Sequence, residues 1–214
     1  MTDQRRDVTN VTTIDLLRHG ACEGGEIFRG SSDVALSAQG WQQMRAAIAK
    51  EIENEAAPWQ CIVSSSLQRC AHFAEEVAAQ RQLPLQIESR LQEIHFGDWE
   101  MRTHKEIHRE APGLVQRFFD DPFNATPPNG ELMADFRDRV MAAAHDVLQQ
   151  HAGKHILLVT HGAVIRVLLC EWLQLSYAAF SNIAVPYASF SRLRQFRMPD
   201  RSPWMQLCLH RGDW

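Results

Sequence analysis

Residues 155–173 read HILLVTHGAVIRVLLCEWL. The first part, His155–Thr160, is an almost unbroken apolar run, typical of a strand buried on both faces of a parallel sheet. The second part, Gly162–Leu173, repeats its apolar residues with the period of a helix. A buried strand that passes directly into a helix indicates an α/β protein, and His161 lies at the junction. Open α/β sheets bind their ligands at such carboxyl ends of strands.

A second junction of the same form lies near the start of the chain. Val11–Leu17 favours a strand and ends directly in Arg18-His19-Gly20. If the two strands are neighbours, His19 and His161 face each other at one edge of the sheet. The glycine after each histidine permits close approach of the backbone to a ligand. A helix that begins at Gly162 also points its N–H groups and its positive dipole end to this place.

Strand and helix patterns alternate along the rest of the chain. We therefore predict an α/β fold, a three-layer α/β/α sandwich with a mainly parallel central sheet. A length of 214 residues fits one domain, over residues 11–214, after a flexible polar segment at residues 1–10. Further strands are predicted at 61–63, 85–87, 183–196 and 204–209, and helices at 37–54, 67–80, 131–150 and, with a break near Pro112, 103–119.

The composition excludes several classes of protein. The chain has 22 Lys and Arg residues against 26 Asp and Glu residues, a formal net charge of −4, which gives no general positive field for nucleic acid. No apolar run approaches the roughly 18–20 residues that span a bilayer, and no signal peptide opens the chain. Five cysteines without a C-x-x-C pair indicate reduced thiols. We expect a cytoplasmic protein without nucleic-acid or membrane partners, and the sequence leaves a homodimer open.

Positive charge gathers at the predicted strand ends. Arg69 lies in the first turn of the helix that follows the strand Cys61–Val63, and Arg18 precedes His19. Two guanidinium groups, two imidazoles and the N-termini of helices form a site for an oxyanion, because arginine binds phosphate oxygens in pairs. A phosphomonoester, with a charge near −2, is the biological anion that such a site fits best.

Four ordered blocks of the sequence resemble the histidine phosphatase superfamily, also called the phosphoglycerate mutase-like family. Together they cover most of residues 14–170, and their order and spacing are far more specific than an isolated Arg-His-Gly. The blocks are Leu17-Arg18-His19-Gly20, Ser64-Ser65-Ser66-Leu67-Gln68-Arg69, Leu91-Gln92-Glu93-Ile94-His95-Phe96-Gly97-Asp98-Trp99-Glu100 and Val159-Thr160-His161-Gly162.

The resemblance implies a phosphoglycerate mutase-like fold and a role for individual residues. His19 would attack phosphorus and form a phosphohistidine, which divides one difficult hydrolysis into two easier steps. Arg18, Arg69 and His161 would hold the phosphoryl oxygens and stabilise the transition state. Glu93 would protonate the leaving alcohol as a general acid. Such a site requires no metal and no cofactor, and its partner is a small phosphate ester.

Further blocks are similar to the α-ribazole phosphatase branch, namely residues 24–33 (GGEIFRGSSD) and His161–Arg166. This branch removes the 5′-phosphate from α-ribazole phosphate or a related intermediate of corrinoid synthesis, whereas close relatives act on sugar phosphates. Gly162 and Arg29 are candidate substrate contacts, although a solvated surface suits Arg29 equally well. Two further hypotheses remain open, a phosphoglycerate-type mutase and a non-catalytic protein that binds a phosphate ligand.

Several positions need a separate interpretation. His104 and His108 are expected on a solvated helix face, because their H-x-E-x-H order differs from the zinc-protease pattern H-E-x-x-H. Phe28 and Trp99 are expected in the core rather than stacked on an aromatic base. The chain departs from the family pattern at four places: residues 21–25 (ACEGG) lack the usual polar residue and Asn, and Phe73, Met101 and Leu132 replace Thr, Gly and Ser.

Overall fold

One six-stranded sheet forms the centre of the molecule. The structure, a computed structural model, describes residues 10–54 and 58–212. Four strands are parallel, and the last two form an antiparallel hairpin at one edge, so the predicted mainly parallel α/β sheet is confirmed. The strands lie in the order β3 (Leu85–Ile87), β2 (Cys61–Ser64), β4 (His155–Thr160), β1 (Asn10–Arg18), β5 (Phe190–Met198) and β6 (Arg201–Arg211).

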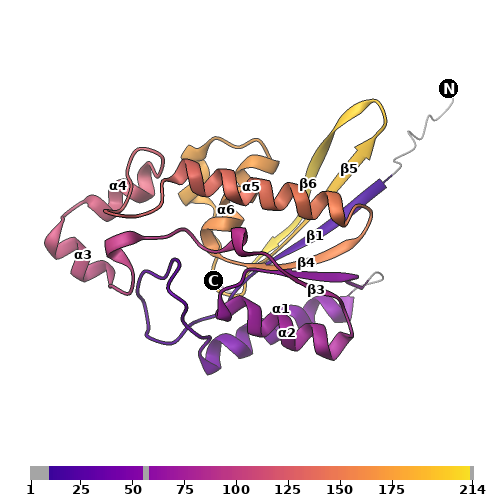
Figure 1. The fold of residues 1–214 in the computed structure, drawn as a ribbon, viewed down its shortest axis with the longest axis horizontal. Helices are drawn as coiled ribbons and strands as arrows, with labels where there is room; N and C mark the ends of the chain where they lie inside the picture. Colours follow the sequence, from indigo (N-terminus) through magenta and orange to yellow (C-terminus); the bar gives the residue numbers. More distant parts are fainter. Residues whose placement is uncertain (1–9, 55–57, 213–214) are drawn as a thin grey trace.

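Helices cover both faces of this sheet, as the three-layer prediction requires. Figure 1 shows α1 (Ala38–Asn54) and α2 (Gln68–Arg81) on one face, and α5 (Met133–Gln150) and α6 (Gly162–Trp172) on the other. Within the described residues, none of the helices has the length and apolar character needed to cross a membrane.

The strands supply two separate cores because their side chains alternate between the faces. In β1, Ile14 and Leu16 pack in the core beneath α5 and α6, whereas Leu17 packs in the core beneath α1 and α2. In β4, Leu158 and Val159 divide between the two cores in the same way. Burial on both faces explains why β4 reads as a continuous apolar run.

Short helices and loops gather beyond the carboxyl ends of the parallel strands. Figure 1 shows α3 (His104–Glu110) and α4 (Leu114–Asp120) at this side of the molecule. The irregular character predicted for residues 91–100 is confirmed, since the region holds only coil and 3₁₀ turns. The described residues include the 3₁₀ helices η1 (Ser89–Leu91), η2 (Gly97–Trp99) and η3 (Tyr177–Asn182).

Several observed strand boundaries differ from the predicted ones. β1 begins at Asn10, one residue inside the segment predicted to be flexible, and residues 1–9 lie outside the described part of the chain. The strand predicted at 183–196 begins only at Phe190. Pro186 has no N–H group for a sheet ladder, and Ala188 adopts a positive φ of 55°, so this segment cannot continue the strand.

Gly20 was predicted to let a ligand approach the backbone closely, whereas in the structure it lets another backbone segment do so. A Cβ atom on Gly20 would overlap the backbone of Gly40, and a Cβ atom on Gly40 would overlap the carbonyl of Ala21. The two glycines therefore allow the start of α1 to pack directly against the segment after His19. Close backbone approach is confirmed, but the approaching group is protein rather than ligand.

Candidate active site

The register of β1 and β4 brings the two predicted histidines together. Arg18 pairs with Thr160, so the strands end level and His19 and His161 follow side by side. Their ring centroids are 5.3 Å apart in an edge-to-face arrangement. Both residues are buried, with His161 fully inaccessible.

His19 is held as a neutral imidazole in one tautomer. Its Nδ1 lies 2.8 Å from the carbonyl oxygen of Gly20, which can only accept, so Nδ1 carries the hydrogen. The other ring nitrogen, Nε2, therefore keeps its lone pair. Burial first, and then the positive charges of Arg18 and Arg69, hold the pKa of His19 well below its usual 6.5. A neutral Nε2 is a nucleophile at neutral pH.

His161 is fixed from both sides of its ring. Arg69 Nε donates to His161 Nδ1 at 3.2 Å, and His161 Nε2 lies 2.7 Å from Ser65 Oγ. Because Arg69 can only donate, the hydrogen of neutral His161 lies on Nε2 and points to Ser65. Burial and then Arg69 hold the pKa of His161 well below 6.5.

Arg69 is a fully buried cation whose other contacts are backbone carbonyls. Its Nη1 donates to Ser32 O at 2.8 Å and its Nη2 to Gly30 O at 2.6 Å. These carbonyls belong to the glycine-rich loop, which Glu100 holds in turn by accepting hydrogen bonds from the N–H groups of residues 30–32. A carboxylate thus positions the loop that positions Arg69.

Glu93 lies across the site at the N-terminus of α6. Both of its carboxylate oxygens lie 3.2 Å from the backbone N of Ala163. The residue is buried, and it follows η1 in a segment without a strand partner. The irregular loop carboxylate predicted from the sequence therefore belongs to the site.

A cavity of about 170 Å³ joins most of these groups. Arg18, His19, Arg29, Glu93 and Gly162 line it, so the structure brings together five of the seven predicted site residues around one cavity. The remaining two, Arg69 and His161, do not line the cavity and are fully buried, with the ring of His161 against that of His19.

Four arginines around this cavity lack an anionic partner. Within the described residues, Arg18, Arg29, Arg69 and Arg166 form no ion pair with a carboxylate, whereas arginines at other places, such as Arg45 with Glu76, do. The Nε atoms of Arg18 and Arg29 are buried and have no hydrogen-bond partner. Burial lowers the pKa values of Arg18 and Arg166. Desolvated cations without partners are costly to a fold, so this place suits an anionic ligand.

Arg29 and Gly162 lie where a substrate could reach them. Arg29 is buried, which excludes the solvated alternative, and its Nη2 is anchored on the carbonyls of Glu23 and Gly25. A Cβ atom on Gly162 would lie 3.3 Å from Arg18 Nε and 3.4 Å from Arg166 Nη1. The two guanidinium groups therefore converge over the first residue of α6.

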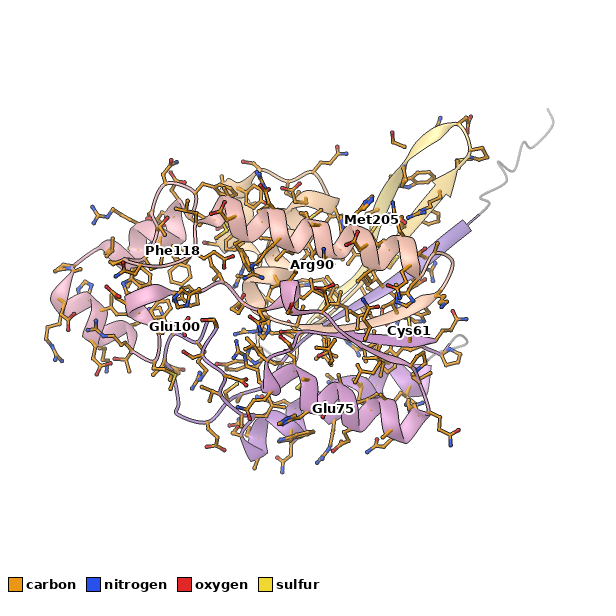
Figure 2. All side chains as sticks on the ribbon, viewed as in Figure 1. Cys61, Glu75, Arg90, Glu100, Phe118 and Met205 are labelled. Carbon is orange, nitrogen blue, oxygen red and sulfur yellow. The ribbon has the colours of Figure 1, made fainter. Side chains whose placement is uncertain are left out.

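Apolar and aromatic side chains form the rest of the cavity lining, the aromatic wall. Figure 2 shows Phe118 in this region, beyond the carboxyl ends of the strands. Trp99 and Phe28 are both buried, as predicted, and Phe28 also lines the cavity. His104 and His108 are both exposed, as predicted for a solvated helix face, and the ring of His104 also stacks on Phe28 with ring centroids 4.4 Å apart. The wall consists of Ile27, Phe28, Phe96, His104, Phe118, Phe119, Phe180 and Tyr187.

Sequence reasoning missed three residues of the site. Arg166 lies one helical turn after Gly162, and this i, i+4 spacing could have placed it beside the glycine. Ser65 was part of a quoted block but had no role before its contact with His161. Tyr187 lies 4.4 Å below the Arg18 guanidinium in the coil before β5, where no periodic pattern marks it.

The departures from the family pattern leave the core of the site intact. Phe73 is fully buried between the sheet and α2. Met101 adopts a positive φ of 62°, which explains why glycine is usual there. Leu132 is the exposed N-cap of α5, where it makes no capping hydrogen bond. Among the residues that the structure describes, no cluster of three or more His, Cys, Asp or Glu side chains could hold a metal ion.

Comparisons with known proteins agree with this geometry. A sequence model of the histidine phosphatase superfamily (branch 1) matches residues 14–199. The chain is 28% identical over 182 residues to the adenosylcobalamin/alpha-ribazole phosphatase of Escherichia coli, covering 83% of this chain and 87% of the relative. It is 33% identical over 174 residues to the glucosyl-3-phosphoglycerate phosphatase of Mycolicibacterium vanbaalenii, covering 77% and 76%.

A solved structure shares the whole fold. The complex of a mycobacterial glucosyl-3-phosphoglycerate phosphatase with VO3 superposes with a TM-score of 0.81 at 26% sequence identity. The match covers 92% of this chain and 97% of that chain. The phosphoglycerate mutase-like α/β fold that the sequence blocks implied is thus confirmed.

Proposed function

The chain belongs to the histidine phosphatase superfamily (branch 1), and on this premise we propose that it hydrolyses a small phosphate ester through a phosphohistidine on His19. The observation that carries the proposal is the state of His19. Its hydrogen is on Nδ1, its Nε2 is unprotonated, and it lies in a cavity wall with arginines that have no carboxylate partner. A nucleophile and a site for the phosphate charge therefore occur together.

In the first step, His19 Nε2 attacks phosphorus and the bond from phosphorus to the ester oxygen breaks. Charge on the phosphoryl oxygens is stabilised by Arg18 and by the N–H groups at the start of α6 near Gly162, with Arg29 beside them. Arg69 does not line the cavity; it donates three hydrogen bonds within the protein and adds its positive charge close to His19. The ring of His161 packs against the ring of His19 and accepts a hydrogen bond from Arg69.

Glu93 supplies the proton that the leaving oxygen needs. Its position in the lining of the same cavity as His19 suits a general acid. In the second step, a water molecule attacks phosphorus and the bond from phosphorus to Nε2 breaks. Glu93 takes the proton from that water, inorganic phosphate leaves, and both side chains return to their starting states.

The aromatic wall supports an ester whose alcohol part contains a flat apolar group. Phe28, His104 and Tyr187 offer ring faces and edges next to the phosphate end of the cavity. We therefore propose α-ribazole 5′-phosphate, or a related intermediate of cobalamin synthesis, as the substrate. The relative from Escherichia coli, an adenosylcobalamin/alpha-ribazole phosphatase, supports this choice.

A phosphate ester with a carboxylate is the second candidate. Arg166 uses only its Nε within the protein, on the carbonyl of Ile183, and its Nη1 lies next to Gly162. These remaining donors would bind a carboxylate in pairs. The glucosyl-3-phosphoglycerate phosphatase among the relatives makes such an ester the natural competitor.

A panel of phosphate esters separates these proposals. We expect phosphate release from α-ribazole 5′-phosphate with the highest kcat/KM of the panel, and a lower value for glucosyl-3-phosphoglycerate. The opposite ranking would favour the carboxylate-bearing substrate. Transfer of phosphate between glycerate phosphates without net release would indicate a mutase, and binding without turnover of any ester would indicate a phosphate-binding protein.

A further inference from the structure

The segment that carries Glu93 has no sheet to hold it. Residues 92–96 lie between η1 and η2 and belong to no strand. A general acid must nevertheless be held in one place, because catalysis by proton transfer depends on hydrogen-bond geometry. The contacts that fix this segment are therefore of functional interest.

One guanidinium group binds the backbone on the N-terminal side of the acid. Arg139, on α5, donates from Nη1 to the carbonyl oxygens of Arg90 at 2.7 Å and Gln92 at 2.8 Å. Its Nη2 donates to the carbonyl oxygen of Glu93 itself at 3.0 Å. Figure 2 shows Arg90, at the start of this stretch, beside α5.

Glu131 binds this guanidinium group and also contacts the backbone on the C-terminal side of Glu93. We call Arg139 and Glu131 together the clamp. The two oxygens of Glu131 accept from Arg139 Nε at 2.6 Å and Nη2 at 2.9 Å. The backbones of Glu131 and His95 are also joined, by a hydrogen bond from Glu131 N to His95 O at 2.9 Å. All five N–H groups of Arg139 are thus used, three of them on the backbone around Glu93.

We propose that Arg139, oriented by Glu131, is the positioning residue for Glu93. This inference rests on the proposed function, since it assumes that Glu93 is the general acid. Arg139 touches no substrate. It sets the distance from the Glu93 carboxyl group to the leaving oxygen by fixing the backbone carbonyls of Arg90, Gln92 and Glu93 on one rigid group of α5.

A positioning role of Arg139 predicts a loss of activity that depends on the leaving group, whereas a purely structural role does not. An alkoxide leaving group needs the proton of Glu93, whereas 4-nitrophenolate departs without one. Loss of Arg139 should therefore slow the cleavage of an alkyl ester much more than that of an aryl ester. The quantity to compare is kcat/KM, because it reports the steps up to formation of the phosphohistidine.

The test uses benzyl phosphate and 4-nitrophenyl phosphate, which present a similar ring to the cavity. We expect Arg139→Lys to lower kcat/KM for benzyl phosphate by about 10- to 100-fold, part of the roughly 10²- to 10⁴-fold that a general acid contributes. The value for 4-nitrophenyl phosphate should change by less than about threefold. Glu131→Gln should show the same selectivity with a smaller loss.

Two further variants calibrate the result. Arg137→Lys is the matched control on the same helix, because Arg137 is bonded to its exposed neighbour Asp138 and not to the Glu93 segment. It should leave both values unchanged. Glu93→Gln should give the full selective loss. The ratio of the two kcat/KM values is measured on one sample, so a variant that folds incompletely changes both values and leaves the ratio intact.

Equal losses for both substrates in Arg139→Lys, together with a selective loss in Glu93→Gln, would overturn the positioning role and leave the proposed function standing. An equal loss of kcat/KM for both substrates in Glu93→Gln would instead show that Glu93 is not the general acid. That result would contradict both the positioning role of Arg139 and the catalytic step proposed for Glu93. The proposal is supported if the ratio of kcat/KM for benzyl phosphate to kcat/KM for 4-nitrophenyl phosphate shifts in Arg139→Lys and Glu131→Gln toward the ratio found for Glu93→Gln.

Discussion

At the scale of single residues, the protonation state of His19 decides whether it can act as the nucleophile. The imidazole is buried beside Arg18 and Arg69, and Gly20 fixes its hydrogen on Nδ1. Neither effect depends on a substrate. The nucleophile is therefore prepared in the free protein, and its state can be measured there.

The titration of His19 gives the first prediction. Its pKa is lowered, so the ring should remain neutral as the pH falls through 6.5 and should accept a proton only well below that value. We would follow the imidazole ¹⁵N shifts by NMR and assign them with His19→Gln. A His19 resonance that titrates at or above pH 6.5 would contradict this state.

The same shift affects stability, and its sign follows from linkage. His19 and His161 both have folded-state pKa values well below 6.5, so the unfolded chain binds more protons once the pH falls below 6.5. Their contribution makes the free energy of unfolding decrease as the pH falls from 6.5 toward the folded-state values. Above pH 6.5 this contribution is constant.

At the scale of elements, the N-terminus of α5 is capped poorly. Leu132 has the extended backbone of an N-cap, with φ −66° and ψ 138°, but its side chain cannot accept a hydrogen bond. Serine, which is usual at this place in the family, can accept one from the free N–H groups of the first turn. The departure from the family pattern therefore costs stability and not chemistry.

Leu132→Ser should raise the free energy of unfolding by about 1 kcal/mol. For a chain of this size we expect an increase in Tm of about 2–4 °C, measured by thermal unfolding. The kcat/KM for 4-nitrophenyl phosphate should stay the same, because Leu132 does not line the cavity. An unchanged or lower Tm would show that the exposed leucine makes a contact more valuable than the cap.

Regular elements were predictable from the sequence because they repeat a pattern. The apolar run of β4, the helical period of α5 and the N-cap Ser37 of α1, which accepts a hydrogen bond from Gly40 N, are all found as expected. The coil before β5 was predicted as strand because its apolar residues resemble a strand pattern, and the effect of Pro186 on that pattern was not taken into account. Side chains that enter the site from such coil, Tyr187 above all, carry no local signal.

The site itself was predictable only in part, for the same physical reason. The apolar strand runs that precede His19 and His161 are local patterns and placed each histidine at a strand end, whereas their meeting depends on the pairing of β1 with β4. The separation of Arg69 from the cavity wall, and the clamp of Arg139 on the Glu93 segment, depend on tertiary packing between distant segments. No spacing along the chain encodes those contacts.

At the scale of the whole molecule, charge is distributed unevenly. The formal net charge is −4, and many arginines outside the site are paired with carboxylates, such as Arg192 with Asp15 and Glu51. Arg18, Arg29 and Arg166, which line the cavity, and the buried Arg69 next to His161 have no such partner in the described part of the chain. Buried arginines without a carboxylate partner thus gather at one small place of an acidic protein, which suits a phosphate ester better than a polyanion.

The most direct test of the account is to trap the phosphohistidine. The protein is mixed with 4-nitrophenyl phosphate, quenched in alkali, in which phosphohistidine survives, and digested for mass spectrometry. We predict a phosphoryl group on the peptide that contains His19, lost on brief acid treatment and absent in His19→Ala, which should fold but release no phosphate. Undiminished phosphate release by His19→Ala, with no phosphoryl group on His19 in the unaltered protein, would contradict the central claim.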